Sequence, residues 1–218
     1  MTDRPIRRSL PALLALLGAL PALASAQAPP PTAVPVPTVL VLIDIQNFYF
    51  PGGAMALVDP LPASLQAKRL LEHFRAKGWP VVHVQHLPKD QDAPTPDTGD
   101  LSYRIHPNVR PVAGETVIGK HHANAFRETD LVAVLRRLGA KRLVVAGMQT
   151  HMCVEAAARH AADLGFEVVV VHDACATRAL SFNGAEVPAA QVHATVLAAL
   201  AGTYARVVST AELLAELK

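Results

Sequence analysis

The chain has 218 residues, of which 51% are hydrophobic and 17% are charged, and its formal net charge is +2 at pH 7. This length is sufficient for one sizeable hydrophobic core. The charges form no concentrated basic patch, so the composition gives no support to nucleic-acid binding.

Residues 1–26 have the pattern of a secretory signal peptide. Arginines precede an apolar stretch that is too short to span a membrane comfortably, and Ala24-Ser25-Ala26 fits a small-x-small cleavage site. We expect cleavage before Gln27, export to the periplasm or the medium, and no membrane attachment afterwards. An uncleaved membrane anchor is the alternative. Cleavage removes three arginines and one aspartate, so the formal net charge falls from +2 to zero.

Residues 27–37 are rich in proline and are expected to form an extended linker, because proline cannot continue a helix. Residues 38–218 are expected to form one domain in which apolar strands alternate with amphipathic helices. The expected strands are residues 39–44, 81–86, 115–119, 142–147, 167–172 and 205–208, and the expected helices are residues 61–77, 128–138, 152–164, 187–201 and 210–217. This alternation predicts an α/β, Rossmann-like architecture of three layers, with helices on both faces of a mostly parallel six-stranded sheet.

Three residues of complementary chemistry lie at the ends of these strands. Asp44 ends the first strand, Lys120 follows the third, and Cys153 begins the helix that follows the fourth. Because sites in open parallel sheets form beyond the carboxyl ends of the strands, we expect the three side chains to converge. Unpaired N–H groups and the helix dipole favour a thiolate at a helix start, which suits Cys153 as a nucleophile. A buried structural cysteine is the alternative for Cys153 considered alone. Residues 87–111 are expected to form a surface loop that covers this edge of the sheet.

The order of motifs resembles that of the isochorismatase-like cysteine hydrolases, which include nicotinamidases and N-carbamoylsarcosine amidohydrolases. The motifs are Asp-x-Gln-Asn (44–47), the strand-end Lys120 and Gly-x-x-Thr-x-x-Cys-Val (147–154). The resemblance extends from about Val39 to Leu214, nearly all of the expected mature chain. It is supported by Pro51-Gly52-Gly53, Asn124-Ala125-Phe126 and His172-Asp173-Ala174-Cys175-Ala176-Thr177.

This resemblance implies hydrolysis of an amide-type carbon–nitrogen bond of a small molecule through a thioester on Cys153. Asp44 would act as general base and acid, and Lys120 as its electrostatic partner. The resemblance places the oxyanion hole at the backbone N–H groups of Gln149 and Cys153, and a non-proline cis peptide between Met148 and Gln149. Thr150 is expected to be the N-cap of the catalytic helix. Relatives form dimers or tetramers, so we expect a homodimer or homotetramer.

The pocket is expected to differ from that of nicotinamidases. Phe48-Tyr49 stands where many members of the family have Asp-Phe, which predicts a more apolar mouth. Candidate substrate contacts are Gln46, Phe50, His121, Phe126 and Phe182. We expect no cofactor and no site metal, because the Asp-x-His pair of nicotinamidases has no counterpart here and His83 and His86 fall on opposite faces of a strand.

Three other functions stay open on the sequence alone. An isochorismatase-type vinyl-ether hydrolase would use Asp44 and would not need the thiol. A non-catalytic small-molecule binding protein on the same fold would need no nucleophile. A redox sensor would need the sulfurs of Cys153 and Cys175 within bonding distance. We expect both cysteines to be reduced in the active form, because a stable bridge would block the nucleophile.

Overall fold

The computed structural model describes Met1, residues 36–88 and residues 101–217. The predicted signal peptide and most of the linker therefore lie outside the described residues, as does part of the predicted surface loop. By its contacts the chain divides into a segment, Met1–Val34, and a compact unit, Pro35–Lys218. Within the described ranges, no helix combines the length and the apolar character needed to cross a membrane.

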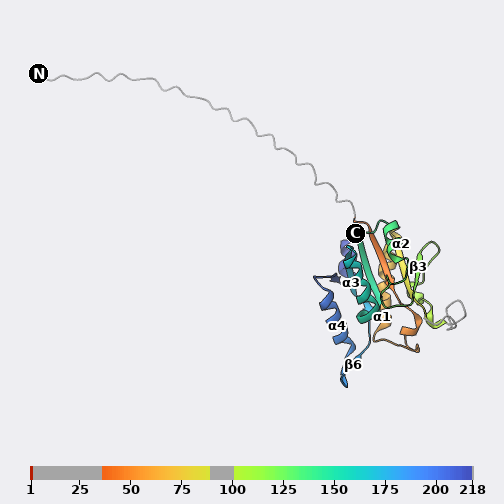
Figure 1. Cartoon of the computed structure of the whole chain (residues 1–218). Helices are drawn as coiled ribbons and strands as arrows, with labels where there is room; N and C mark the ends of the chain where they lie inside the picture. The colour runs from red at the N-terminus through yellow and green to blue at the C-terminus, as the bar shows by residue number, and fades with distance from the viewer. Residues whose placement is uncertain (2–35, 89–100, 218) are drawn as a thin grey trace. The chain divides into compact units, whose positions relative to one another are not determined.

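The compact unit is built on a sheet of six parallel strands in the order β3-β2-β1-β4-β5-β8 (Figure 1). The strands are β1 (Thr38–Ile43), β2 (Val81–His86), β3 (Thr116–Lys120), β4 (Arg142–Met148), β5 (Glu167–Ala176) and β8 (Arg206–Val208). The predicted α/β fold with six strands is confirmed, and every pair of neighbouring strands in this sheet is parallel. Valine is the most frequent residue of the inner strands, as expected where helices cover a sheet on both faces.

Two hydrophobic cores lie on opposite faces of the sheet, and alternate residues of β1 serve each of them. Val39, Val41 and Ile43 belong to the core under α2 (Leu131–Arg137), α3 (Glu155–Asp163) and α4 (Ala189–Leu200). Leu40 and Leu42 belong to the core under α1 (Pro60–Ala76) and α5 (Thr210–Glu216). This division follows from the two-residue period of a strand, which turns successive side chains to opposite faces.

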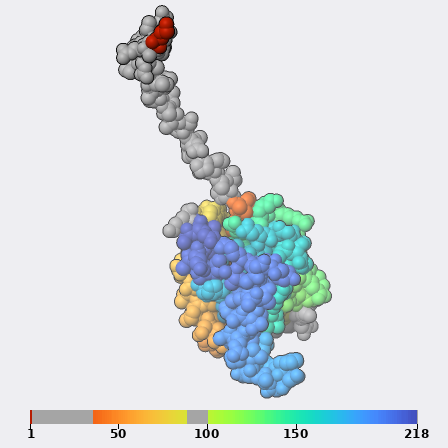
Figure 2. All heavy atoms as spheres, turned by 90° about the vertical axis from the view of Figure 1, so that its left-hand side faces the viewer, coloured from red at the N-terminus to blue at the C-terminus, as the bar shows by residue number. Residues whose placement is uncertain are grey.

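Several short elements connect these strands and helices. Three are 3-10 turns, η1 (Asn47–Tyr49), η3 (Leu101–Tyr103) and η4 (Pro107–Val109). Another is an antiparallel hairpin of β6 (Leu180–Phe182) and β7 (Ala185–Val187), which projects from the domain (Figure 2). Our sequence prediction missed this hairpin. Its turn, Asn183-Gly184, has positive φ at both residues, and Asn-Gly between short strands is the sequence pattern that would have indicated it.

The path of the chain creates a switch point between β1 and β4. From β1 the chain adds β2 and then β3 on one side, and it returns to place β4 on the other side of β1. Crevices at such switch points are the usual binding sites of open α/β sheets. Gly147 lies at this crossing with φ of +140°, and a Cβ atom there would be 2.0 Å from the Ile43 carbonyl oxygen. Glycine therefore allows the ends of the two strands to approach closely.

Candidate active site

The side chains of Asp44, Lys120 and Cys153 meet at the carboxyl edge of the sheet. Lys120 Nζ lies 2.6 Å from Asp44 Oδ2 and donates to Cys153 Sγ at 3.3 Å. Asp44 and Lys120 are completely buried, and Cys153 is 3% exposed. The structure therefore joins an acid, an ammonium group and a thiol that come from three different strand ends.

Lys120 is held by two further groups. Its Nζ donates to the His122 carbonyl oxygen at 3.0 Å and lies 3.4 Å from His86 Nδ1. His86 ends β2, the strand between β1 and β3, and it stands opposite Lys120 in the register. Our sequence analysis missed His86 as a site residue. Its place at a strand end is the same pattern that identified Asp44 and Lys120.

Asp44 follows β1 in a backbone conformation that is uncommon for a residue with a side chain, with φ of 50°. Burial raises the pKa of the Asp44 carboxyl, and the charge of Lys120 acts in the opposite direction. A raised pKa makes the ionised carboxylate a stronger base than a carboxylate in water. The ammonium of Lys120 stabilises the ionised form in this buried position.

Cys153 lies in a π-helical turn, η5 (Thr150–Val154), directly before α3. The Val154 N–H group donates to the Gln149 carbonyl oxygen at 3.2 Å, which closes this wider turn. Burial, and after it the negative charge of Asp44, raise the pKa of Cys153 to about 12, although Lys120 acts in the opposite direction. The resting group is therefore a thiol, unlike the thiolate that a helix start favours, and it needs a base to ionise.

Thr150 is not the N-cap of the catalytic helix, so that prediction was wrong. Gln149 occupies the capping position and makes no side-chain cap bond. Thr150 is already part of the π-helical turn, and its Oγ1 lies 2.9 Å from His193 Nδ1 on α4. The hydroxyl therefore links the turn to a neighbouring helix.

The peptide bond between Met148 and Gln149 is cis. It follows β4 and leads into the turn that carries Cys153. The Gln149 side chain is 2% exposed, and its Nε2 donates to the hydroxyl of Tyr49 at 3.3 Å. Tyr49 belongs to η1, which follows Asp44, so this bond connects the segments after β1 and β4.

Gln46 and Phe50, both expected to contact substrate, are buried and have protein partners. The Gln46 carboxamide accepts from the His86 N–H group at 2.8 Å and donates to the His86 carbonyl oxygen at 2.9 Å. It also donates to the Tyr103 carbonyl oxygen at 2.6 Å. Phe50 stacks on His106 with ring centroids 3.7 Å apart.

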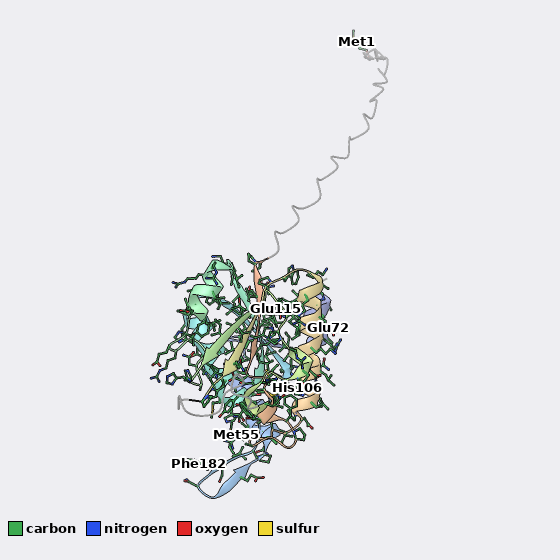
Figure 3. All side chains as sticks on the ribbon, turned by 90° about the vertical axis from the view of Figure 1, so that its right-hand side faces the viewer. Met1, Met55, Glu72, His106, Glu115 and Phe182 are labelled. Atoms are coloured by element: carbon green, nitrogen blue, oxygen red, sulfur yellow. The ribbon has the colours of Figure 1, made fainter. Side chains whose placement is uncertain are left out.

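The other three expected contacts lie in different surroundings. Phe126 packs in a hydrophobic core and stacks on His160 with centroids 5.0 Å apart. His121 Nδ1 lies 2.8 Å from the Pro88 carbonyl oxygen at an exposed position. Phe182 is 74% exposed and stands at the end of the projecting hairpin (Figure 3). These contacts do not join Phe126, His121 or Phe182 to Asp44, Lys120 or Cys153.

A cavity of about 290 Å³ adjoins His86, the neighbour of Lys120. Its lining residues are Phe48, Ala54, Met55, His86, Ser102 and Tyr103. Two of them contact the site, because His86 lies against Lys120 and the Phe48 ring packs on Tyr49 with centroids 4.2 Å apart. Across residues 36–88 and 101–217, no group of three or more His, Cys, Asp or Glu side chains is arranged to hold a metal ion.

A family model described as the isochorismatase domain matches residues 38–212. The chain belongs to the isochorismatase family. The isochorismatase family protein YddQ of Bacillus subtilis is 47% identical over 173 residues, which are 79% of this chain and 96% of YddQ. The secreted isochorismatase effector Isc1 of Verticillium dahliae is 34% identical and covers 85% of this chain and 94% of its own length.

Solved structures support the same assignment. An isochorismatase hydrolase from Oleispira antarctica superposes with a TM-score of 0.79 at 48% identity, covering 84% of this chain and 99% of that chain. Two further members of the family are named for carbon–nitrogen chemistry. Maleamate amidohydrolase of Pseudomonas putida is 30% identical over 65% of this chain and 73% of its own length. N-carbamoylsarcosine amidase of Thermoplasma acidophilum has a TM-score of 0.65 at 27% identity, covering 79% of this chain and 96% of that chain. The protein is therefore an isochorismatase-family hydrolase.

Proposed function

We propose that this protein is an exported cysteine hydrolase that cleaves an amide-type carbon–nitrogen bond of a small molecule. One observation carries the proposal: the Lys120 ammonium lies 2.6 Å from the Asp44 carboxylate and 3.3 Å from the Cys153 thiol inside the protein. A nucleophile, a base and a fixed positive charge are what acyl transfer through a thioester needs. The amidohydrolase and amidase relatives support this reaction class.

In the acylation step, Asp44 takes the proton of the Cys153 thiol as the sulfur attacks the substrate carbonyl carbon. The new C–S bond places an electron pair on the carbonyl oxygen, which the backbone N–H groups of Gln149 and Cys153 would hold. Asp44 then gives its proton to the amide nitrogen, the C–N bond breaks, and an amine or ammonia leaves. The acyl group remains on Cys153 as a thioester.

In the deacylation step, water attacks the thioester carbon while Asp44 takes a proton from that water. The C–S bond breaks, and the proton returns to the sulfur, which restores the thiol and releases a carboxylic acid. The Lys120 ammonium would stabilise the ionised form of Asp44 in both steps. No cofactor takes part in either step.

Export is the part of the proposal that rests on residues 1–26. The existence of the secreted relative Isc1 supports it. Fractionation of cells that express the full chain tests it, and mature protein that begins at Gln27 outside the cytoplasm is the expected result. Light scattering on that material tests the proposed homodimer or homotetramer.

The experiment that tests the reaction is intact-mass analysis during exposure to a panel of small amides. A substrate should add its acyl mass to the Cys153 peptide and release an amine or ammonia. Cys153→Ala should lose both signals, whereas Cys175→Ala keeps the nucleophile and should retain both. Hydrolysis that persists in Cys153→Ala would contradict the thioester and favour acid catalysis by Asp44 on a vinyl ether.

A further inference from the structure

The side chain of Gln149 leaves a buried hydrogen-bond acceptor unused. Its Nε2 donates to the Tyr49 hydroxyl, but its Oε1 has no hydrogen-bond partner among residues 36–88 and 101–217, although Gln149 is 2% exposed. Buried polar atoms in folded proteins nearly always have a partner. An unsatisfied acceptor at this depth therefore marks a place where a ligand can supply a donor.

This acceptor belongs to the catalytic region. Gln149 directly follows the end of β4 and precedes the turn that carries Cys153. Its partner Tyr49 is 3% exposed, and burial followed by the negative charge of Asp44 raises the pKa of the Tyr49 hydroxyl. Cys153 contributes to the same shift. The Tyr49 hydroxyl therefore lies close enough to Asp44 for the charge of its carboxylate to act on it.

The neighbouring cavity gives a ligand an approach to this pair. Phe48 lines the cavity and packs on the Tyr49 ring, and His86 lines it and lies against Lys120. Two residues of the cavity wall are therefore direct neighbours of Tyr49 and of Lys120. The cavity walls are largely apolar or aromatic, so Gln149 would supply polar recognition at the inner end.

We propose that Gln149 Oε1 accepts a hydrogen bond from an N–H group of the substrate, and that Tyr49 orients the Gln149 carboxamide for this role. Since Nε2 is the atom bound to Tyr49, Oε1 of the same carboxamide keeps its capacity to accept a hydrogen bond. The inference rests on the proposed function and narrows it to amides that carry an N–H group beside the acyl carbon. Esters of the same shape lack this donor and are disfavoured. Tyr49 is a positioning residue in this arrangement.

Alkylation of Cys153 by two matched probes tests the inference without knowledge of the natural substrate. N-methyl-2-iodoacetamide and methyl iodoacetate have the same shape, but only the amide carries an N–H donor. In both reactions a C–S bond forms, the C–I bond breaks, iodide leaves and the thiol proton is released. The ratio of the two rates, divided by the ratio for glutathione, reports recognition of the N–H group.

We expect this normalised ratio to favour the amide about 2- to 10-fold in the unaltered protein, the range of one neutral hydrogen bond. Gln149→Met removes the acceptor at similar size, and Tyr49→Phe removes only the hydroxyl that orients it. Both should bring the ratio close to 1. Tyr204→Phe removes a hydroxyl near Arg159, and it should keep the preference. A ratio near 1 in the unaltered protein, or a preference that survives both variants, overturns the inference.

An inert Cys153 would contradict the proposed function, and the subsite would then be tested by binding. Ligand-observed NMR would compare N-methylacetamide with methyl acetate on the unaltered protein and on Gln149→Met. A preference for the amide that disappears in Gln149→Met supports the subsite on its own. Equal binding of the two compounds to the unaltered protein overturns it.

Discussion

The Gln46 carboxamide forms a pair of hydrogen bonds with the backbone of His86, one through its oxygen and one through its nitrogen. It thereby extends the pairing of β1 and β2 beyond the last residue of β1. Gln46 therefore holds the end of β2 in place, where His86 lies against Lys120. Gln46, which the sequence suggested as a substrate contact, is a structural clamp for the site.

Gln46→Leu should destabilise the protein by about 2 to 4 kcal/mol, because it removes three hydrogen bonds of a completely buried side chain, two to the His86 backbone and one to the Tyr103 carbonyl oxygen. Urea unfolding measures this loss. Gln66→Leu is the matched control on α1, where the glutamine accepts a bond from Arg69 at an exposed position. That control should change the free energy of unfolding by less than about 0.5 kcal/mol. Equal losses in the two variants would contradict the clamp.

Lys120→Met should destabilise the protein by about 3 to 5 kcal/mol, because it leaves the Asp44 carboxylate buried without an opposite charge. Adding Asp44→Asn to Lys120→Met should recover part of this loss. Urea unfolding of the two single variants and the double variant measures the coupling. Lys68→Met breaks the exposed pair with Glu72, and it should cost no more than about 1 kcal/mol. Simple additivity of the two site variants would show that the pair is not coupled.

Gly147→Ala should destabilise the protein far more than Gly139→Ala. Both glycines have positive φ, so alanine is strained at either position, at a cost of roughly 1 to 2 kcal/mol. Only at Gly147 does the added Cβ meet the Ile43 carbonyl oxygen, whereas the space at Gly139 is open. Thermal unfolding of the two variants compares the effects. Similar midpoints would mean that β1 and β4 can separate without cost.

Stability should fall in acid through Glu115. Burial alone would raise the pKa of Glu115, but hydrogen bonds from Arg75, from the Val112 N–H group and from His83 lower it to about 2 from an ordinary value of 4.5. Between these values the unfolded chain binds more protons than the folded protein, so the contribution of Glu115 is full above pH 4.5 and is lost as the pH falls towards 2.

Glu115→Gln should therefore weaken the decline of the unfolding free energy between pH 5 and about pH 2.5. Urea unfolding at several pH values in this window measures the slope. Glu72→Gln alters an exposed carboxylate on α1 and should leave the slope close to that of the unaltered protein. Identical slopes for Glu115→Gln and the unaltered protein would rule out this role.

The sequence was sufficient to place Asp44, Lys120 and Cys153 at one edge, because parallel strands present their carboxyl ends together and each apolar run marked where a strand ends. It was not sufficient to predict the backbone conformation at Thr150 or the burial of Cys153. The local sequence is compatible with an α-helical start as well as with the π-helical turn that the structure has. The burial of Cys153 depends on tertiary packing, which no local pattern shows. Burial reverses the expected direction of its pKa shift.

Long-range pairings explain the remaining differences. β5 continues to Ala176, beyond its expected end at residue 172, because a register shift on β4 between Val145 and Gly147 lets Gly147 pair with Cys175. The partners of Gln46 and Phe50 are His86, Tyr103 and His106, which lie far along the chain, so no local pattern identifies them. In contrast, the hairpin at Asn183-Gly184 and the role of His86 follow from local patterns that the sequence contains.

Strand β2 contributes none of the residues Asp44, Lys120 and Cys153. Because it lies between β1 and β3, it sets the distance that the charged group on β3 must span to reach Asp44. β1 and β3 are each about 4.8 Å from β2, so Lys120 must reach across roughly 10 Å between backbones to meet Asp44. A long, unbranched side chain with a compact charged end suits that span, and a shorter amine at position 120 would stop beside His86. The need for a side chain as long as lysine is thus a consequence of strand order. If β1 paired directly with β3, a shorter charged side chain would reach Asp44.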